Sequence, residues 1–96
     1  METVFFKDHQ KLTAAVSGRL DSNTVRKLEE ELKRNLVGMN EIIFDFADLD
    51  YISSAGIRVL LGCHKRLLGN MKIRNANETI LDVFKMTGMS SIFNVE

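Results

Sequence analysis

Residues 42–61 read IIFDFADLDYISSAGIRVLL, and this stretch decides the fold. Its first part, IIFDF, is apolar on both faces, which is typical of a short central strand covered on both sides. A helix-like stretch begins near Ala55, directly after the adjacent serines Ser53 and Ser54. The sequence therefore predicts a buried strand, a loop, and a helix with two hydroxyl groups at its first turn.

The start of a helix is a suitable place for an anion. Unpaired backbone N–H groups and the positive end of the helix dipole favour negative charge there, including a phosphoryl group on serine. Ser is also a favoured N-cap residue, so the alternative from residue chemistry alone is that Ser53 and Ser54 only cap the helix. For Gly56, in the same turn, the simplest interpretation is a close approach of two backbone segments.

The remaining sequence alternates between strand and helix patterns. Strands are predicted at residues 4–6, 12–16, 71–74 and 92–95, and helices at about residues 23–36, 55–68 and 77–86. The predicted order is β-β-α-β-α-β-α-β. An N-terminal antiparallel hairpin followed by alternating elements indicates an α/β fold with a mixed, mostly parallel sheet and about three helices. We expect residues 1–96 to form a single domain.

The composition is that of an ordinary globular protein, with 45% hydrophobic and 27% charged residues. Thirteen basic and thirteen acidic residues cancel, so no electrostatic argument favours nucleic acid or an anionic membrane as a partner. The N-terminus has no signal-peptide pattern, and the longest aliphatic run is only Val59-Leu60-Leu61. Together with the lone Cys63, which has no internal disulfide partner, these features predict a cytoplasmic protein.

Catalysis fits the sequence poorly. A serine nucleophile elbow needs Gly two residues before the serine, and Ile52 stands there for Ser54. His64 lies ten residues further along the same predicted helix, about 15 Å away, which is too far for a general base. We expect a half-buried helical His64 and a protein that is not an enzyme.

Metal binding is also not expected. Asp45, Asp48 and Asp50 are close in sequence, but neither an EF-hand glycine nor its final glutamate follows them at the required spacing. We expect Asp45 and Asp48 to organise the turn after the strand, Cys63 to be a core thiol, and no cofactor.

The first predicted helix has a charged face. Glu29–Lys33 and Glu30–Arg34 are opposite charges at i, i+4, which predicts ion pairs on a solvated surface.

Three blocks of sequence resemble the STAS domain family, which contains the bacterial anti-sigma factor antagonists. Residues 18–21, GRLD, resemble the Gly-x-Leu-Asp element before the first helix of that family. Residues 42–57 resemble its central strand and switch loop, and residues 77–89 its third helix with a glycine at the end. The second block is the most specific, and the resemblance covers essentially the whole chain.

The resemblance implies a phosphorylation site in the switch loop. Aligned on Gly56, the family's phosphoacceptor hydroxyl falls on Ser54, and Ser53 is a secondary candidate. Ser53 itself occupies the position of the family's usual Asp, and Ala55 the position of its second hydroxyl. Asp21 is expected close to the acceptor in space. The resemblance thus implies a partner-binding surface comprising Asp21, Ser53, Ser54 and Gly56. We add Arg58 to this surface because of its position on the helix, although the family often has a small residue there.

Such domains take part in partner switching. The resemblance implies that the unphosphorylated chain binds an anti-sigma factor, usually a serine kinase of the GHKL type, and so releases a sigma factor. The kinase phosphorylates the serine, the complex dissociates, and a PP2C-type phosphatase restores the starting state. The alternative is a STAS scaffold in another signalling complex that is never phosphorylated. We expect a monomer or a weak dimer.

Arg58 stands four residues after Ser54, which places both on one helix face. That face also carries Gly62 and Lys65, without a large apolar residue, and is therefore predicted to be exposed. We hypothesise that Arg58 contacts a phosphoryl group on Ser54 or an acidic patch of a partner.

Overall fold

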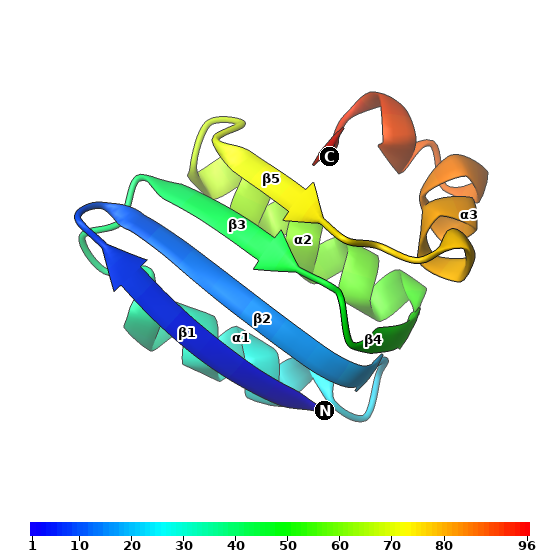
Figure 1. Ribbon diagram of the computed structural model, residues 1–96, viewed down its shortest axis with the longest axis horizontal. Coiled ribbons are helices and arrows are strands. Elements are labelled where there is room, and N and C mark those ends of the chain that lie inside the picture. The colour runs from blue at the N-terminus through cyan, green and yellow to red at the C-terminus, as the bar shows by residue number, and fades with distance from the viewer.

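The computed structural model describes residues 1–96 as a six-stranded sheet with three α-helices and a short 3₁₀ helix (Figure 1). The strands are β1 (Glu2–Asp8), β2 (Lys11–Leu20), β3 (Glu41–Asp45), β4 (Leu49–Ile52), β5 (Met71–Arg74) and β6 (Asn94–Val95). The helices are α1 (Val25–Asn35), α2 (Ser54–Arg66), α3 (Glu78–Met86) and the 3₁₀ helix η1 (Met89–Ser91).

The sheet is mixed, as the sequence predicts. Its strand order is β1-β2-β3-β5-β6, with β4 pairing with β2 away from this path. β1 is antiparallel to β2, and every other pairing is parallel. α1 and α2 lie against one face of the sheet, whereas α3 lies beyond the end toward which β3 and β5 point (Figure 1). The predicted α/β fold with an antiparallel N-terminal hairpin is confirmed.

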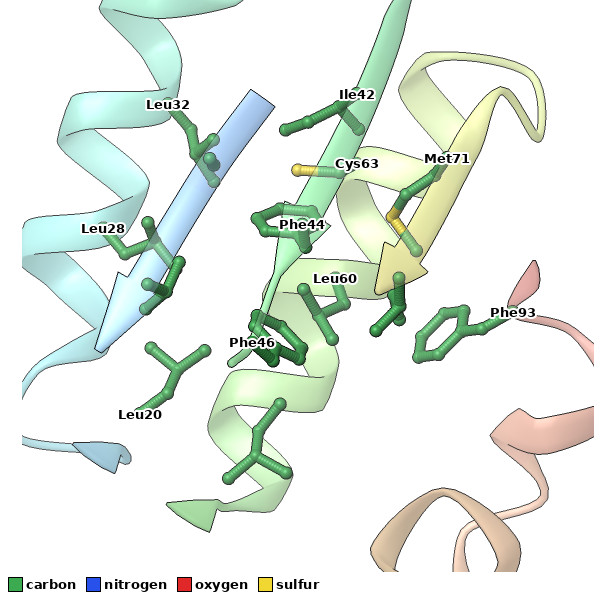
Figure 2. Close-up of a cluster of buried hydrophobic side chains, with 14 of the residues drawn as sticks. Leu20, Leu28, Leu32, Ile42, Phe44, Phe46, Leu60, Cys63, Met71 and Phe93 are labelled. Carbon is green, nitrogen blue, oxygen red and sulfur yellow. The ribbon is translucent and has the colours of Figure 1, made fainter. Parts of the chain in front are cut away.

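β3 forms the centre of the sheet and is buried on both faces. Ile42 and Phe44 are fully buried in the layer between the sheet and the helices, as Figure 2 shows. Ile43 faces the opposite side because side chains alternate along a strand, yet it is only 3% exposed beside its strand partners Thr13 and Lys72. Burial on both faces explains why this segment lacks polar alternation.

β4 corrects the predicted element order, which has a loop between the third strand and the second helix. Leu49–Ile52 pairs in parallel with residues 18–20 of β2, beyond the residues of β2 that pair with β3. Its sequence, Leu49-Asp50-Tyr51-Ile52, ends in two consecutive apolar residues and lacks the strict alternation that predicts β5. Its formation depends on β2, which continues to Leu20 instead of ending at the predicted Val16.

Gly18 is the residue that allows β2 to continue. Its φ of +86° lies in the left-handed region that glycine tolerates best, and the register of the β2–β4 pairing shifts between Gly18 and Arg19. The Gly18 N–H donates to the Asp48 carbonyl oxygen at 3.0 Å, which joins the shifted strand to the segment before β4. Residues 18–20, whose sequence suggests the approach to a helix, therefore belong to the sheet.

The last strand is shorter than predicted. Residues 92–95 are expected to pair, but only Asn94–Val95 does so. The N–H groups of Ile92 and Phe93 both donate to the Met89 carbonyl oxygen, which closes the 3₁₀ turn instead. Phe93 is buried edge-on against Phe84 of α3, with ring centroids 5.4 Å apart. Burial of Phe93 against α3 therefore replaces strand pairing at residues 92–93.

The predicted ion pairs on α1 do not form, although its charged face is exposed. The ion pairs of the structure are His9–Asp8, Arg19–Asp21 and Lys27–Glu2. An exposed i, i+4 pair contributes only a few tenths of a kcal/mol, which is too little to fix two long side chains in one geometry.

Cys63 and His64 lie in the second half of α2 as predicted. Cys63 is buried in the core, and His64 is half-buried with its ring 6.1 Å from that of Phe93. Burial raises the pKa of the Cys63 thiol to about 11, a shift that nearby Arg66 partly opposes. None of the helices has the length and apolar character needed to cross a bilayer.

The raised pKa predicts a loss of stability at alkaline pH. An unfolded chain loses the Cys63 proton near pH 9.0, whereas the folded chain keeps it until about pH 11, so the stabilising effect is complete below pH 9.0 and disappears as the pH rises toward 11. The free energy of unfolding from urea titrations should fall by up to about 2–3 kcal/mol across this interval. Cys63→Ala should show a shallower slope, and identical slopes in the two proteins would contradict the assignment.

Candidate functional site

The two serines lie at the junction of β4 and α2. β4 ends at Ile52, Ser53 occupies the N-cap position with an extended backbone, and Ser54 is the first residue of α2. Ser53 is half-buried and Ser54 is exposed. The structure therefore separates the pair into one serine within the junction and one at the surface.

A backbone hydrogen bond joins this junction to the end of β2. The Ser53 N–H donates to the Leu20 carbonyl oxygen at 2.9 Å, one residue beyond the pairing of Leu20 with Ile52. Asp21 follows Leu20 directly, so the structure brings Asp21 beside Ser53. The end of one strand thus supplies a carboxylate to the start of α2, although the two segments are more than 30 residues apart in sequence.

Gly56 allows α2 to pack closely on these strand ends. A Cβ atom at Gly56 would lie 2.7 Å from Cγ1 of Ile52, a distance that real Cβ atoms essentially never show, and 3.0 Å from Cγ of Leu20, which is tighter than most Cβ contacts. The expected close approach is therefore present. Because Gly56 is buried, it can influence a partner surface only by positioning the residues around it.

The Asp21 carboxylate is held in place by its own segment. Its Oδ1 accepts a hydrogen bond from the Asn23 N–H at 3.0 Å, an Asx turn, and its Oδ2 lies 3.6 Å from Nε of Arg19. The side chain is 21% exposed. It therefore supplies a positioned negative charge at the edge of the junction.

Arg19 and Tyr51 belong to this surface and are not among the residues singled out from sequence. They are strand partners in the β2–β4 pairing, and the Arg19 guanidinium lies 4.4 Å from the centre of the Tyr51 ring. Such a contact is a cation–π interaction. Arg19 therefore contacts both Tyr51 and Asp21, and only the pairing of β4 with β2 reveals this arrangement.

Ser53 occupies the N-cap position, but its side chain does not cap α2. The interpretation of Ser53 as a capping residue is therefore wrong. Its side chain accepts no hydrogen bond from the first turn of α2, and its Oγ is buried without a hydrogen-bond partner. By contrast, Asn77 caps α3 by accepting a hydrogen bond from the Ile80 N–H at 2.9 Å. The N-terminus of α2 is left without a side-chain cap.

Arg58 is exposed one turn after Ser54 and takes part in no ion pair. Gly62 and Lys65, the other members of the predicted polar stripe, are also exposed. Four of the predicted partner-binding residues, Asp21, Ser53, Ser54 and Arg58, thus lie around one helix start.

The Asp45 side chain organises the turn after β3, as predicted. Its Oδ1 accepts hydrogen bonds from the Ala47 N–H and from Nδ2 of Asn75, both at 3.1 Å. Asp48 contributes its carbonyl oxygen to the bond with Gly18 described above, and its side chain is exposed.

Comparison with known proteins connects this chain with a family. The sequence pattern of the STAS domain matches residues 4–96. BtrV of Bordetella bronchiseptica, named as a candidate anti-sigma factor antagonist, is 35% identical over 88 residues, covering 88% of this chain and 76% of BtrV. The anti-sigma-B factor antagonist of Staphylococcus epidermidis is 30% identical over 99 residues, covering 99% of this chain and 90% of that protein.

Solved structures with the same fold include two forms of one antagonist. The unphosphorylated anti-sigma factor antagonist SpoIIAA matches with a TM-score of 0.85 and 19% identity, over 99% of this chain and 88% of that one. The phosphorylated form of SpoIIAA from Bacillus matches with a TM-score of 0.75 and 19% identity, over 99% and 91%. At these identities the likeness establishes the fold.

The role of Gly56 is tested by a matched pair of substitutions in α2. Gly56→Ala should lower the free energy of unfolding by about 1–3 kcal/mol, because the new methyl group collides with Ile52 and Leu20. Gly62→Ala meets no atom within 4 Å and should raise it by up to about 1 kcal/mol through helix propensity. Urea denaturation measures both, and equal stabilisation by the two variants would refute close packing at Gly56.

The hydroxyl group of Ser53, which has no hydrogen-bond partner, leads to a second prediction. Ser53→Ala should change the free energy of unfolding by less than about 0.5 kcal/mol, because no hydrogen bond is lost. Asn77→Ala, which removes a true cap, should cost about 1–2 kcal/mol. If Ser53→Ala proved as costly as Asn77→Ala in denaturation, the hydroxyl would have to cap α2 in solution.

Proposed function

This chain belongs to the STAS domain family, and from that premise we propose that it is an anti-sigma factor antagonist switched by phosphorylation of Ser54. In its unphosphorylated state it binds an anti-sigma factor and thereby frees a sigma factor for transcription. The relatives named as anti-sigma factor antagonists support the binding role. The observation that carries the switch is the exposure of Ser54 in the uncapped first turn of α2.

The physical chemistry of this position favours a phosphoserine without disturbing the fold. A phosphate adds about −1.5 to −2 charges, and the unpaired N–H groups and dipole of a helix N-terminus stabilise negative charge. Ser54 is a surface residue, so the new group replaces water and not packed side chains. Arg58, one turn away and free of ion pairs, is positioned to offset part of the new charge.

The same charge opposes binding of a partner. The Asp21 carboxylate is already paired with Arg19 at 3.6 Å, so the phosphate adds net negative charge to the edge of the junction. Like charges brought together in an interface cost several kcal/mol, and each 1.4 kcal/mol is a factor of ten in affinity. Local charge alone is therefore sufficient to release a partner that contacts Asp21 and Ser54.

The proposed switch requires two enzymes, and in this proposal the chain itself supplies neither activity. A serine kinase of the GHKL type, acting also as the anti-sigma factor, would phosphorylate Ser54, and a PP2C-type phosphatase would remove the phosphate. In this chain His64 contacts Phe93, nearly three helical turns after Ser54, which gives the serine no neighbouring base on α2.

The proposal predicts one phosphate at one residue. After incubation with its anti-sigma factor kinase and ATP, the protein should gain a single phosphate by intact mass, and Ser54→Ala should gain none while Ser53→Ala still gains one. Affinity for the kinase, measured by titration calorimetry, should fall at least about 100-fold on phosphorylation.

The alternative outcomes separate the remaining possibilities. Binding to the anti-sigma factor without any phosphate transfer would identify the chain as an unswitched STAS scaffold. Phosphorylation of the Ser54→Ala variant but not of the Ser53→Ala variant would show that Ser53, the half-buried serine, accepts the phosphate. That result would refute the proposed role of Ser54.

A further inference from the structure

A groove of about 290 Å³ runs between α1 and α2 and is lined by residues of both helices. The two helices run in the same direction, because each returns the chain between parallel strands. Val25 and Ala55 line one end of the groove, and Leu36 and Arg66 line the other. Over this length α2 rises about 16 Å, which is three turns of helix.

The floor of the groove is apolar, and its rim carries excess positive charge. The apolar lining residues are Val25, Leu32, Leu36, Ala55, Val59 and Cys63. Lys33, Arg58 and Arg66 line the groove together with the single acidic residue Glu29. None of these four charged side chains takes part in an ion pair. The rim therefore offers a net positive surface to an acidic partner.

Gly62 provides an independent observation at the same place. It lies in the middle of α2 and lines the groove, and a Cβ atom added there would meet nothing within 4 Å. A glycine inside a helix costs about 1 kcal/mol relative to alanine. Unlike Gly56, Gly62 is required neither by packing within the chain nor by a positive φ. Its effect on the structure is to keep the groove open.

We infer that this groove binds an acidic amphipathic helix of the anti-sigma factor, an inference that rests on the proposed function for the identity of the partner. A groove between two helices commonly binds the apolar face of a third helix. The length of this groove accommodates about three turns of such a helix. Carboxylates flanking that face would pair with Lys33, Arg58 and Arg66. The missing side chain at Gly62 allows the bound helix to approach α2 closely.

The groove is continuous with the switch. Ala55 follows Ser54 directly, and both Ala55 and Arg58 line the groove near that end. A partner that contacts Ser54 can therefore extend along α2 in the same binding event. Phosphoserine at this end competes for Arg58 with the carboxylates of the bound helix, which couples the phosphate to the whole groove and not only to the junction.

Two substitutions test the groove without altering the switch residues. Gly62→Leu fills the groove, and Arg66→Glu reverses a rim charge at the end far from Ser54. Arg34→Glu is the matched control, because Arg34 is exposed in the last turn of α1 but does not line the groove. Titration calorimetry with the purified anti-sigma factor at about 150 mM salt limits long-range effects of charge.

We expect the two groove variants each to bind at least about 30-fold more weakly than wild type, and Arg34→Glu to remain within about threefold. Gly62→Leu should unfold at or above the wild-type temperature, which rules out misfolding as the cause. Both groove variants should still accept a phosphate on Ser54 at high kinase concentration.

Other outcomes overturn the inference in distinguishable ways. If wild type and both groove variants bind with equal affinity, the groove is not the docking site, while the proposed function stands. If wild type does not bind the anti-sigma factor, the proposed function fails and the inference fails with it. If sedimentation shows a dimer that Gly62→Leu disrupts, the groove binds a second copy of this chain instead.

Discussion

The hydrogen bond from the Ser53 N–H to the Leu20 carbonyl oxygen is the contact on which the candidate site depends. It extends the β2–β4 pairing to the first residue before α2 and so determines where the helix starts relative to the sheet. Gly56 completes the contact by letting the first turn of α2 approach Leu20 and Ile52. Without this hydrogen bond and the close packing at Gly56, the Asp21 carboxylate and the Ser54 hydroxyl would have no fixed positions relative to each other.

A junction of this kind suits a switch that acts through charge. The core beneath it contains only apolar side chains and the neutral thiol of Cys63, so a surface phosphate has no buried polar network to rearrange. In the proposed switch, a change in partner affinity through surface charge therefore requires no rearrangement of this core.

The sequence predicts what depends on local pattern, and it fails where distant segments meet. The doubly apolar β3, the three helices and the exposed stripe containing Arg58 follow from periodicity alone. β4 does not, because its pairing requires a β2 extended past Gly18. The contact between Arg19 and Tyr51 is equally invisible without that pairing. The unpartnered hydroxyl of Ser53 contradicts a good local rule, since a serine at an N-cap position normally caps its helix.

Amide chemical shifts before and after phosphorylation of Ser54 test the central claim most directly. If the phosphate acts as a local charge on a rigid junction, two-dimensional NMR spectra should change only near residues 19–23 and 51–58. The amides of β1, β3 and β5 should keep their positions. Shifts spread across these three strands would show that phosphorylation remodels the sheet, and the account of a switch by surface charge would then be wrong.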